Sequence, residues 1–273
     1  MSELRLNVRE NAYHFLEESL RKREESAADT KALKLATILA TQGIELLLKA
    51  RLGAEHPLLV LADLDRLRSR RTVGVEVAIA RLSGAGVELD EEDLRRLRRA
   101  QRLRNEFMHY EVVATIEQLE AAFADLLEFA HVFHLHEFDG ELHDELSDDV
   151  WQVEAFVMEQ FRRNLVTYQG SEVVNWFPSE ILDAQFVTQF IIEGCEWARI
   201  PRGAEGDYGH RTDNPCSNCA VVSGQYHALA CSKERCPKCG GGALDCGCET
   251  EGYLETEEME TAHWFQPRQR MGP

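Results

Sequence analysis

Residues 214–248 read NPCSNCAVVSGQYHALACSKERCPKCGGGALDCGC, and this stretch decides the fold of the C-terminal part of the chain. It contains two Cys-x2-Cys pairs, Cys216 with Cys219 and Cys236 with Cys239, separated by sixteen residues. Each pair forms a tight turn that directs two thiolates toward one ion, and two such turns complete the tetrahedron that zinc prefers. The spacing therefore predicts a Zn²⁺ site formed by these four cysteines.

The same stretch offers four further ligands, which are His227, Cys231, Cys246 and Cys248. Together the eight side chains are enough for two tetrahedral ions. In a cross-braced arrangement the four further ligands form the second site. In a sequential arrangement the first Cys-x2-Cys pair joins His227 and Cys231 instead. A single ion with spare ligands is the third alternative, and the sequence leaves all three open.

A full set of four protein ligands closes a zinc site, whereas a catalytic zinc keeps an open position. We therefore expect a structural metal. The segment resembles zinc ribbons, and this resemblance implies a small folding unit that binds nucleic acid or protein. Its basic residues are few (Arg211, Lys233, Arg235 and Lys238), so the stretch by itself predicts only weak binding to nucleic acid.

The chain has 273 residues and a net charge of −18, and this charge is unevenly distributed. Residues 1–136 hold 20 basic and 23 acidic side chains, whereas the remainder holds 10 and 25. An RNA partner is therefore compatible with the first part but not favoured by the second. Because the sequence has neither a secretory signal nor a run of about 20 apolar residues, we expect a soluble, cytoplasmic protein without a membrane partner.

Eight cysteines in a chain of this kind indicate metal binding more than disulfides. Seven of them fall between Cys216 and Cys248. The eighth, Cys195, is expected to be a small buried apolar residue.

Apolar residues at helical spacing predict a mainly α fold, with an antiparallel bundle of four or five helices before residue 137. The expected helices span 4–22, 30–52, 75–82, 89–110 and 116–133, with further helices over 150–165 and 179–198. Residues 137–154 hold eight acidic and no basic side chains, a composition typical of a solvated boundary. The predicted domains are a bundle (1–136), an acidic linker with a helical segment (137–209), a zinc module (210–250) and an acidic flexible tail (251–273).

A second motif, Arg104-Asn105-x3-His109, lies at the end of the helix expected over 89–110. Arg104 and His109 are about 140° apart around the helix and flank one stripe of it. An arginine neutralises phosphoryl charge with a forked donor, and a histidine moves protons near neutral pH. These are the groups needed to cleave RNA without a metal, by attack of the 2′-hydroxyl on the adjacent phosphorus.

This motif, followed by another long helix, resembles the HEPN family, and so does the earlier run 43–52 (GIELLLKARL). The resemblance covers roughly residues 5–136. It implies a helical domain that dimerises through its motif helices and often acts as a metal-independent endoribonuclease, in many cases as a toxin or antiviral defence effector with an antitoxin or defence-system partner. Other members are non-catalytic adaptors. On that alternative, the bundle is a dimerisation scaffold and the zinc module binds a partner protein.

The resemblance also implies a role for each motif residue. His109 would be the acid and base, Arg104 would hold the phosphate, and Asn105 would orient the site. Glu45 is an accessory candidate that could orient Arg104. The competing interpretation pairs Glu45 with Lys49 one helical turn later, in the favourable order of charges.

Overall fold

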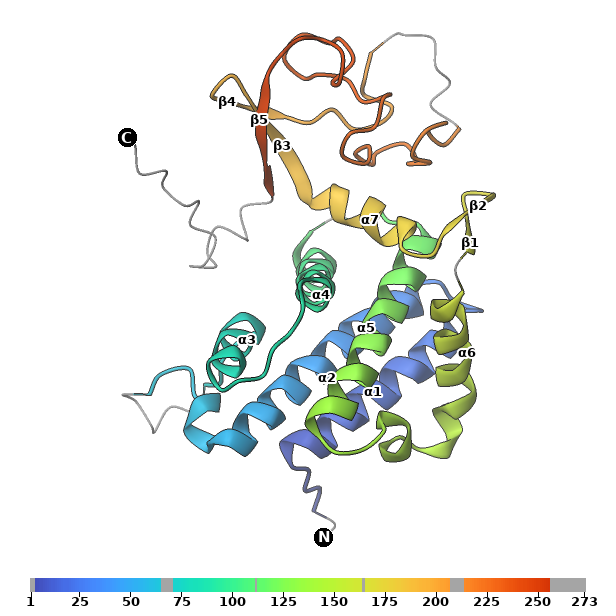
Figure 1. Cartoon of the computed structure of the whole chain (residues 1–273). Helices are drawn as coiled ribbons and strands as arrows, with labels where there is room; N and C mark the ends of the chain where they lie inside the picture. The colour runs from blue at the N-terminus through green and yellow to red at the C-terminus, as the bar shows by residue number, and fades with distance from the viewer. Residues whose placement is uncertain (1–2, 65–70, 111, 164, 207–213, 256–273) are drawn as a thin grey trace. The chain divides into compact units, whose positions relative to one another are not determined.

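The computed structural model describes residues 3–64, 71–110, 112–163, 165–206 and 214–255. The chain divides into two compact units, unit 1 (Met1–Val166) and unit 2 (Thr167–Pro273) (Figure 1). None of the helices in the described ranges is long and apolar enough to cross a membrane.

Unit 1 is helical in its described part. The helices are α1 (Val8–Glu25), α2 (Lys31–Glu55), α3 (Val75–Gly84), α4 (Glu91–His109), α5 (Ile116–Glu137) and α6 (Trp151–Arg162), with short 3₁₀ turns η1 (Pro57–Val60), η2 (Leu142–Glu145) and η3 (Asp148–Val150). The prediction of a mainly α chain with a helical first part is confirmed, and each expected helix up to residue 165 lies within a few residues of an observed one. The family of this bundle stays a prediction.

Local capping explains where the helices begin. The Asn7 side chain accepts a hydrogen bond from the backbone N–H of Glu10, and the Glu10 carboxylate accepts one from the backbone N–H of Asn7. Thr115 and Gln118 form the same reciprocal pair at the start of α5. Such capping satisfies donors that an α-helix leaves free in its first turn.

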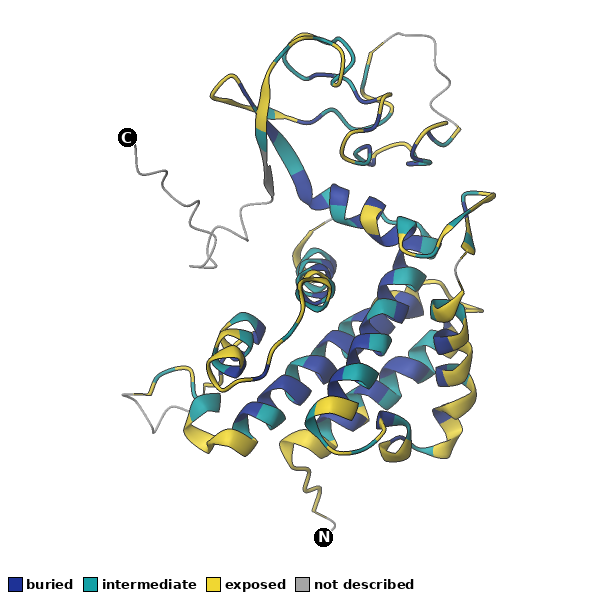
Figure 2. Cartoon of the chain, viewed as in Figure 1, coloured by how far each residue is buried: buried dark blue, intermediate teal, exposed yellow. Residues whose placement is uncertain are grey.

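The core of unit 1 lies where α1, α2 and α5 face each other, and buried residues follow these facing sides in Figure 2. Gly43 allows the close approach of α2 to α1. A Cβ atom at this position would lie 2.8 Å from Leu16 Cγ and 3.1 Å from the carbonyl oxygen of Ala12. The glycine is therefore required by packing, although glycine weakens a helix interior.

Replacing Gly43 by alanine is expected to lower the free energy of unfolding. Overpacking costs about 1–3 kcal/mol, from which a gain in helix propensity of at most about 1 kcal/mol must be subtracted. Gly84→Ala is the matched control, because nothing lies within 4 Å of a Cβ atom there, and it should be neutral or stabilising. Chemical denaturation of both variants checks this, and equal stability of the two would contradict the packing role.

The acidic segment after α5 is packed against unit 1 and is not a solvated linker. Leu142, Leu146 and Val150 are at most 4% exposed. Polar contacts also fix the segment to α1: Arg21 Nε donates to Asp149 Oδ2 at 2.8 Å, and Glu17 Oε1 accepts from the backbone N–H of Ser147 at 2.8 Å. The boundary between the units therefore falls after residue 166, about thirty residues later than the acidic composition suggests.

A buried carboxylate joins this segment to α5 and α6. Glu154 is 3% exposed, and its two oxygens lie 3.0 Å from His131 Nε2 and 2.7 Å from His143 Nδ1. A cavity of about 500 Å³ borders the three side chains. Burial favours the neutral acid, but the two histidines outweigh it and lower the pKa of Glu154, while the hydrogen bond to Glu154 raises the pKa of His143.

These opposite shifts predict a pH optimum for this contact. The contribution of Glu154 is present above its ordinary pKa of 4.5 and is lost as the pH falls through the lower folded value. That of His143 is complete below its ordinary pKa of 6.5 and is lost as the pH rises through the higher folded value. We expect wild type to exceed Glu154→Gln in stability most between these two values, by about 1 kcal/mol, since His143 is partly exposed. Unfolding curves from pH 4 to pH 9 test this, and a difference independent of pH would contradict it.

Unit 2 contains short strands and turns. A hairpin of β1 (Leu165–Tyr168) and β2 (Ser171–Val174) precedes α7 (Phe177–Asp183) and η4 (Ala184–Phe186). A three-stranded antiparallel sheet follows, in the order β4 (Cys195–Ala198), β3 (Val187–Ile192), β5 (Thr250–Glu255).

The helix predicted over 179–198 is wrong beyond residue 186, because this stretch becomes the β3–β4 hairpin. Glu193 and Gly194 connect the strands with φ values of 50° and 71°, the conformation of a two-residue hairpin turn that matches the strand twist. The β-branched residues of β3 fit a pleated strand better than a helix. Cys195, predicted to be buried, is exposed at the start of β4.

Candidate functional site

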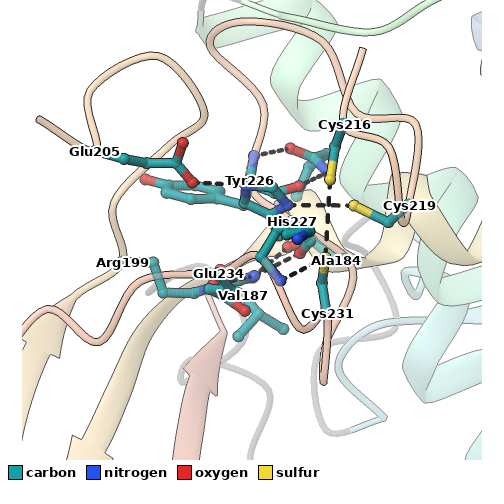
Figure 3. Close-up of polar contacts among 12 residues, drawn as sticks. Ala184, Val187, Arg199, Glu205, Cys216, Cys219, Tyr226, His227, Cys231 and Glu234 are labelled. Carbon is teal, nitrogen blue, oxygen red and sulfur yellow. Dashed lines mark hydrogen bonds and ion pairs between the residues drawn. The ribbon is translucent and has the colours of Figure 1, made fainter. Parts of the chain in front are cut away.

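Cys216, Cys219, His227 and Cys231 form the first cluster, and all four are buried (Figure 3). Their ligand atoms all lie within 4.8 Å of one another. Cys216 Sγ is 3.9 Å from Cys231 Sγ, and Cys219 Sγ is 3.3 Å from His227 Nδ1. Zinc–sulfur bonds of about 2.3 Å in a tetrahedron place two sulfurs about 3.8 Å apart, so the donor set fits a zinc ion.

The second cluster consists of Cys236, Cys239, Cys246 and Cys248, and their sulfur atoms also lie within 4.8 Å of one another. Here only Cys236 is buried, Cys239 is exposed, and the other two are intermediate. Four thiolates suit zinc equally well. These are the two clusters of this kind within the ranges that the structure describes.

The two Cys-x2-Cys turns have the same backbone geometry. Cys216 accepts a hydrogen bond from the N–H of Ala220 at 2.8 Å, and Cys236 accepts one from Gly240 at 2.8 Å. Ala220 and Gly240 both have positive φ, at 56° and 74°. Each turn thus ends in a left-handed residue that folds the chain back.

The grouping of Cys216, Cys219, Cys236 and Cys239 into one site is wrong, and so is the complementary group of His227, Cys231, Cys246 and Cys248. The ligands are arranged sequentially, and each site is closed by the residues that follow its own turn. The physical reason is loop length: Cys231 lies twelve residues after Cys219, and Cys246 lies seven after Cys239, so local closure orders less chain than cross-bracing.

The orientation of His227 is fixed from outside the first cluster. Its Nε2 lies 2.7 Å from Glu205 Oε1, so the carboxylate accepts the Nε2 proton and Nδ1 is left free to face Cys219. Carboxylate–histidine–metal arrangements of this kind hold the tautomer and raise ligand basicity. Burial lowers the pKa of His227, but the hydrogen bonds and charges of Cys216 and Cys231 outweigh it and raise that pKa to about 10.

Arg199 connects the sheet to both clusters. Its side chain is fully buried, and all its N–H groups have acceptors: the Glu234 carboxylate and the backbone carbonyl oxygens of His227, Ala184 and Val187, as Figure 3 shows. The guanidinium also lies 4.9 Å from the ring centroid of Phe190 and 5.1 Å from that of Tyr226. It therefore contacts a first-cluster ligand and the segment that leads into the second cluster.

Replacing Arg199 by methionine is expected to destabilise unit 2 by about 3–5 kcal/mol, because it leaves the buried Glu234 carboxylate without a partner. Burial already raises the pKa of Glu234, with Arg199 opposing it. The double variant Arg199→Met with Glu234→Leu should recover part of the loss. Thermal unfolding of zinc-loaded protein measures both, and a double variant less stable than the single one would contradict a charge penalty.

The motif residues of α4 lie at its C-terminal end. Arg104 and Asn105 are half-buried, and His109 is exposed as the last helical residue. Among the described residues the side chains of Arg104 and His109 form no hydrogen bond or ion pair, and the His109 ring meets the ring of Tyr110 edge-on. Arg96 and Arg99 of the same helix differ, since they pair with Glu92 and Asp125.

Glu45 does not contact Arg104. It accepts a hydrogen bond from Lys49 Nζ at 2.6 Å, and the same ammonium also reaches Thr72 at 3.0 Å. The helix-surface pairing with Lys49 is therefore confirmed, and the role of Glu45 as an accessory to Arg104 is not supported by the geometry.

Sequence reasoning missed Glu205, Arg199 and Glu234 around the clusters, and the Glu154 site in unit 1. None of them belongs to a spaced motif, and charged residues are normally exposed unless they are paired. Their partners are distant in the sequence, so no local signal marks them.

In comparisons with protein-family models, curated proteins and solved structures, no significant match to this chain was found.

Proposed function

We propose that this protein is a metal-independent endoribonuclease that acts as a homodimer through Arg104 and His109. The observation that carries the proposal is a half-buried arginine and an exposed histidine at the end of α4, whose side chains form no hydrogen bond or ion pair with the described residues. An arginine that no carboxylate neutralises is available to a phosphate. The resemblance of the motif to the HEPN family supports the same assignment.

The chemistry follows from these two groups. His109 accepts the proton of the 2′-hydroxyl as it attacks the adjacent phosphorus, and the second copy of His109 in the dimer donates a proton to the departing 5′-oxygen. Arg104 holds the negative charge that develops on the phosphoryl oxygens. Asn105 lies between them on the helix surface and orients the phosphate. The products are a 2′,3′-cyclic phosphate and a 5′-hydroxyl.

Dimerisation would bring two such helix ends together. Exposed apolar side chains surround the motif: Met108 and Tyr110 are each 59% exposed, Val113 45% and Ile116 39%. Such a concentration of exposed apolar area near one helix end is typical of a contact surface. In this proposal the two copies of the motif share one RNA phosphate, in the setting of a toxin or phage-defence effector.

The test is incubation of the purified protein with total RNA in the presence of EDTA. We expect discrete fragments with 2′,3′-cyclic phosphate and 5′-hydroxyl ends, and no cleavage of DNA of the same sequence, which lacks the attacking hydroxyl. Light scattering should give twice the chain mass of 31.1 kDa. Cleavage that requires added Mg²⁺, or that leaves 5′-phosphates, would contradict this mechanism.

One observation favours a second candidate, a non-catalytic adaptor whose metal-binding unit contacts a partner protein. Residues 137–273 carry 10 basic and 25 acidic side chains, a balance that repels RNA and attracts a basic protein surface. A dimer that leaves RNA intact under all conditions would favour this candidate.

A further inference from the structure

The two clusters differ in how far solvent reaches their sulfur atoms. All four ligands of the first cluster are buried, whereas Cys239 of the second is exposed and Cys246 and Cys248 are intermediate. Access by a small reagent is a requirement for thiolate chemistry. Only the second cluster meets it.

They also differ in hydrogen bonds to sulfur. In the first cluster Asn218 donates its backbone N–H to Cys216 Sγ at 3.4 Å and its side-chain amide to Cys231 Sγ at 3.3 Å. In the second cluster the backbone N–H of Gly241 donates to Cys239 Sγ at 3.4 Å, and no side-chain amide or hydroxyl of the described residues donates to a sulfur there. Hydrogen bonds withdraw charge from a thiolate, so the second cluster keeps more of it.

The two clusters also differ in net charge once zinc is bound, and the second cluster is the more negative. With Zn²⁺ bound, three thiolates and an imidazole leave one excess negative charge, whereas four thiolates leave two. Lys238 is a nearby cation, and its ammonium forms an ion pair with Glu193. More negative charge on the sulfurs makes them better nucleophiles toward peroxides and electrophiles.

We propose that the second cluster is an oxidant-reactive metal site, at which the Cys239 thiolate attacks a peroxide and the zinc ion is released, while the first cluster keeps its own. The Cys239 thiolate breaks the O–O bond of hydrogen peroxide and becomes a sulfenic acid, and the leaving hydroxide takes a proton to form water. The Cys248 thiolate then attacks this sulfur, a disulfide forms, and the second oxygen leaves as water after taking up a proton. Two electrons pass from the two sulfurs to the peroxide, and Zn²⁺ leaves without a redox change.

The loss of this site acts directly on the sheet. β5 begins at Thr250, two residues after Cys248, and pairs with β3 from Thr250↔Ile192 to Glu255↔Val187. Cys236 also forms a buried cluster with Phe190 and Ile192 of β3, and Cys246 and Cys248 pack against this cluster. Oxidation of the second cluster therefore loosens the β3–β5 edge.

The experiment adds hydrogen peroxide to the full-length zinc-loaded protein and follows zinc release with a colorimetric chelator. We expect one equivalent to be released at least about tenfold faster than the other. Peptide mapping after rapid alkylation should find Cys239 and Cys248 oxidised first, with Cys216, Cys219 and Cys231 still reduced. Equal release of both ions, or first oxidation in the first cluster, would overturn the proposal.

Two variants test whether the faster release of zinc comes from the second cluster. Cys246→Ser should remove it and leave one slow equivalent, whereas Cys195→Ser removes an exposed thiol outside both clusters and should leave release unchanged. If Cys195→Ser abolishes the fast phase, attack begins outside the metal site and the proposal fails. Mapping of the wild-type protein decides the question even if Cys246→Ser does not fold, and neither readout depends on ribonuclease activity.

Discussion

Zinc-loaded protein is expected to hold two ions per chain, and the double variant Cys216→Ser with Cys231→Ser to hold one. Both serines fall in the first cluster of the structure, so the second site survives. The matched variant Cys216→Ser with Cys236→Ser removes one ligand from each cluster and should hold none. Zinc content measured by mass spectrometry separates the alternatives, because a cross-braced arrangement predicts the opposite result for the two double variants.

Loss of the ions should also unfold the metal-binding part of unit 2. Structural zinc contributes about 10–16 kcal/mol in small zinc domains, since the site does not exist in the unfolded chain. The core beside the first cluster is small, with Tyr168, Ile181 and Val221 packed directly against the ligands. We therefore expect exhaustive chelation to abolish hydrogen-exchange protection in residues 214–255 and to leave the unit 1 helices protected. Retained protection in unit 2 would contradict a structural role for the metal.

The second large effect is expected at the end of α4. His109→Ala should reduce RNA cleavage by about 10²–10⁴-fold, the range for removal of a general acid or base. Arg104→Ala should reduce it by about 10²–10³-fold, as expected for loss of a group that stabilises developing charge. Single-turnover rates with a short labelled RNA measure both, and circular dichroism and light scattering should show an unchanged fold and dimer.

Two matched variants control for the loss of any histidine or arginine on the bundle. His136→Ala removes an exposed histidine of α5, and Arg95→Ala removes an exposed arginine of α4 outside the motif. Both should retain cleavage near the wild-type rate. Activity that survives His109→Ala and Arg104→Ala would end the ribonuclease proposal and favour the adaptor.

Much of unit 1 could be predicted because its signals are local. The helical spacing of apolar residues gave helix positions close to those of the structure. The composition of residues 137–154 led to the wrong prediction of a solvated boundary, since eight acidic side chains suggest solvent exposure. The segment is nevertheless packed, because Leu142 and Val150 bury themselves and Arg21 neutralises Asp149 from a helix more than a hundred residues earlier.

The sequence by itself identified the side chains that could bind metal, because cysteine and histidine at short spacings have few other uses in such a stretch. Only the tertiary structure decided how they divide between two sites, since all eight lie within about thirty residues and several closures satisfy the same tetrahedral chemistry. The structure alone also decided that Glu205 orients His227 and that Arg199 joins the clusters to the sheet. Such contacts join residues far apart in the sequence, and their energy depends on burial, which no local pattern records.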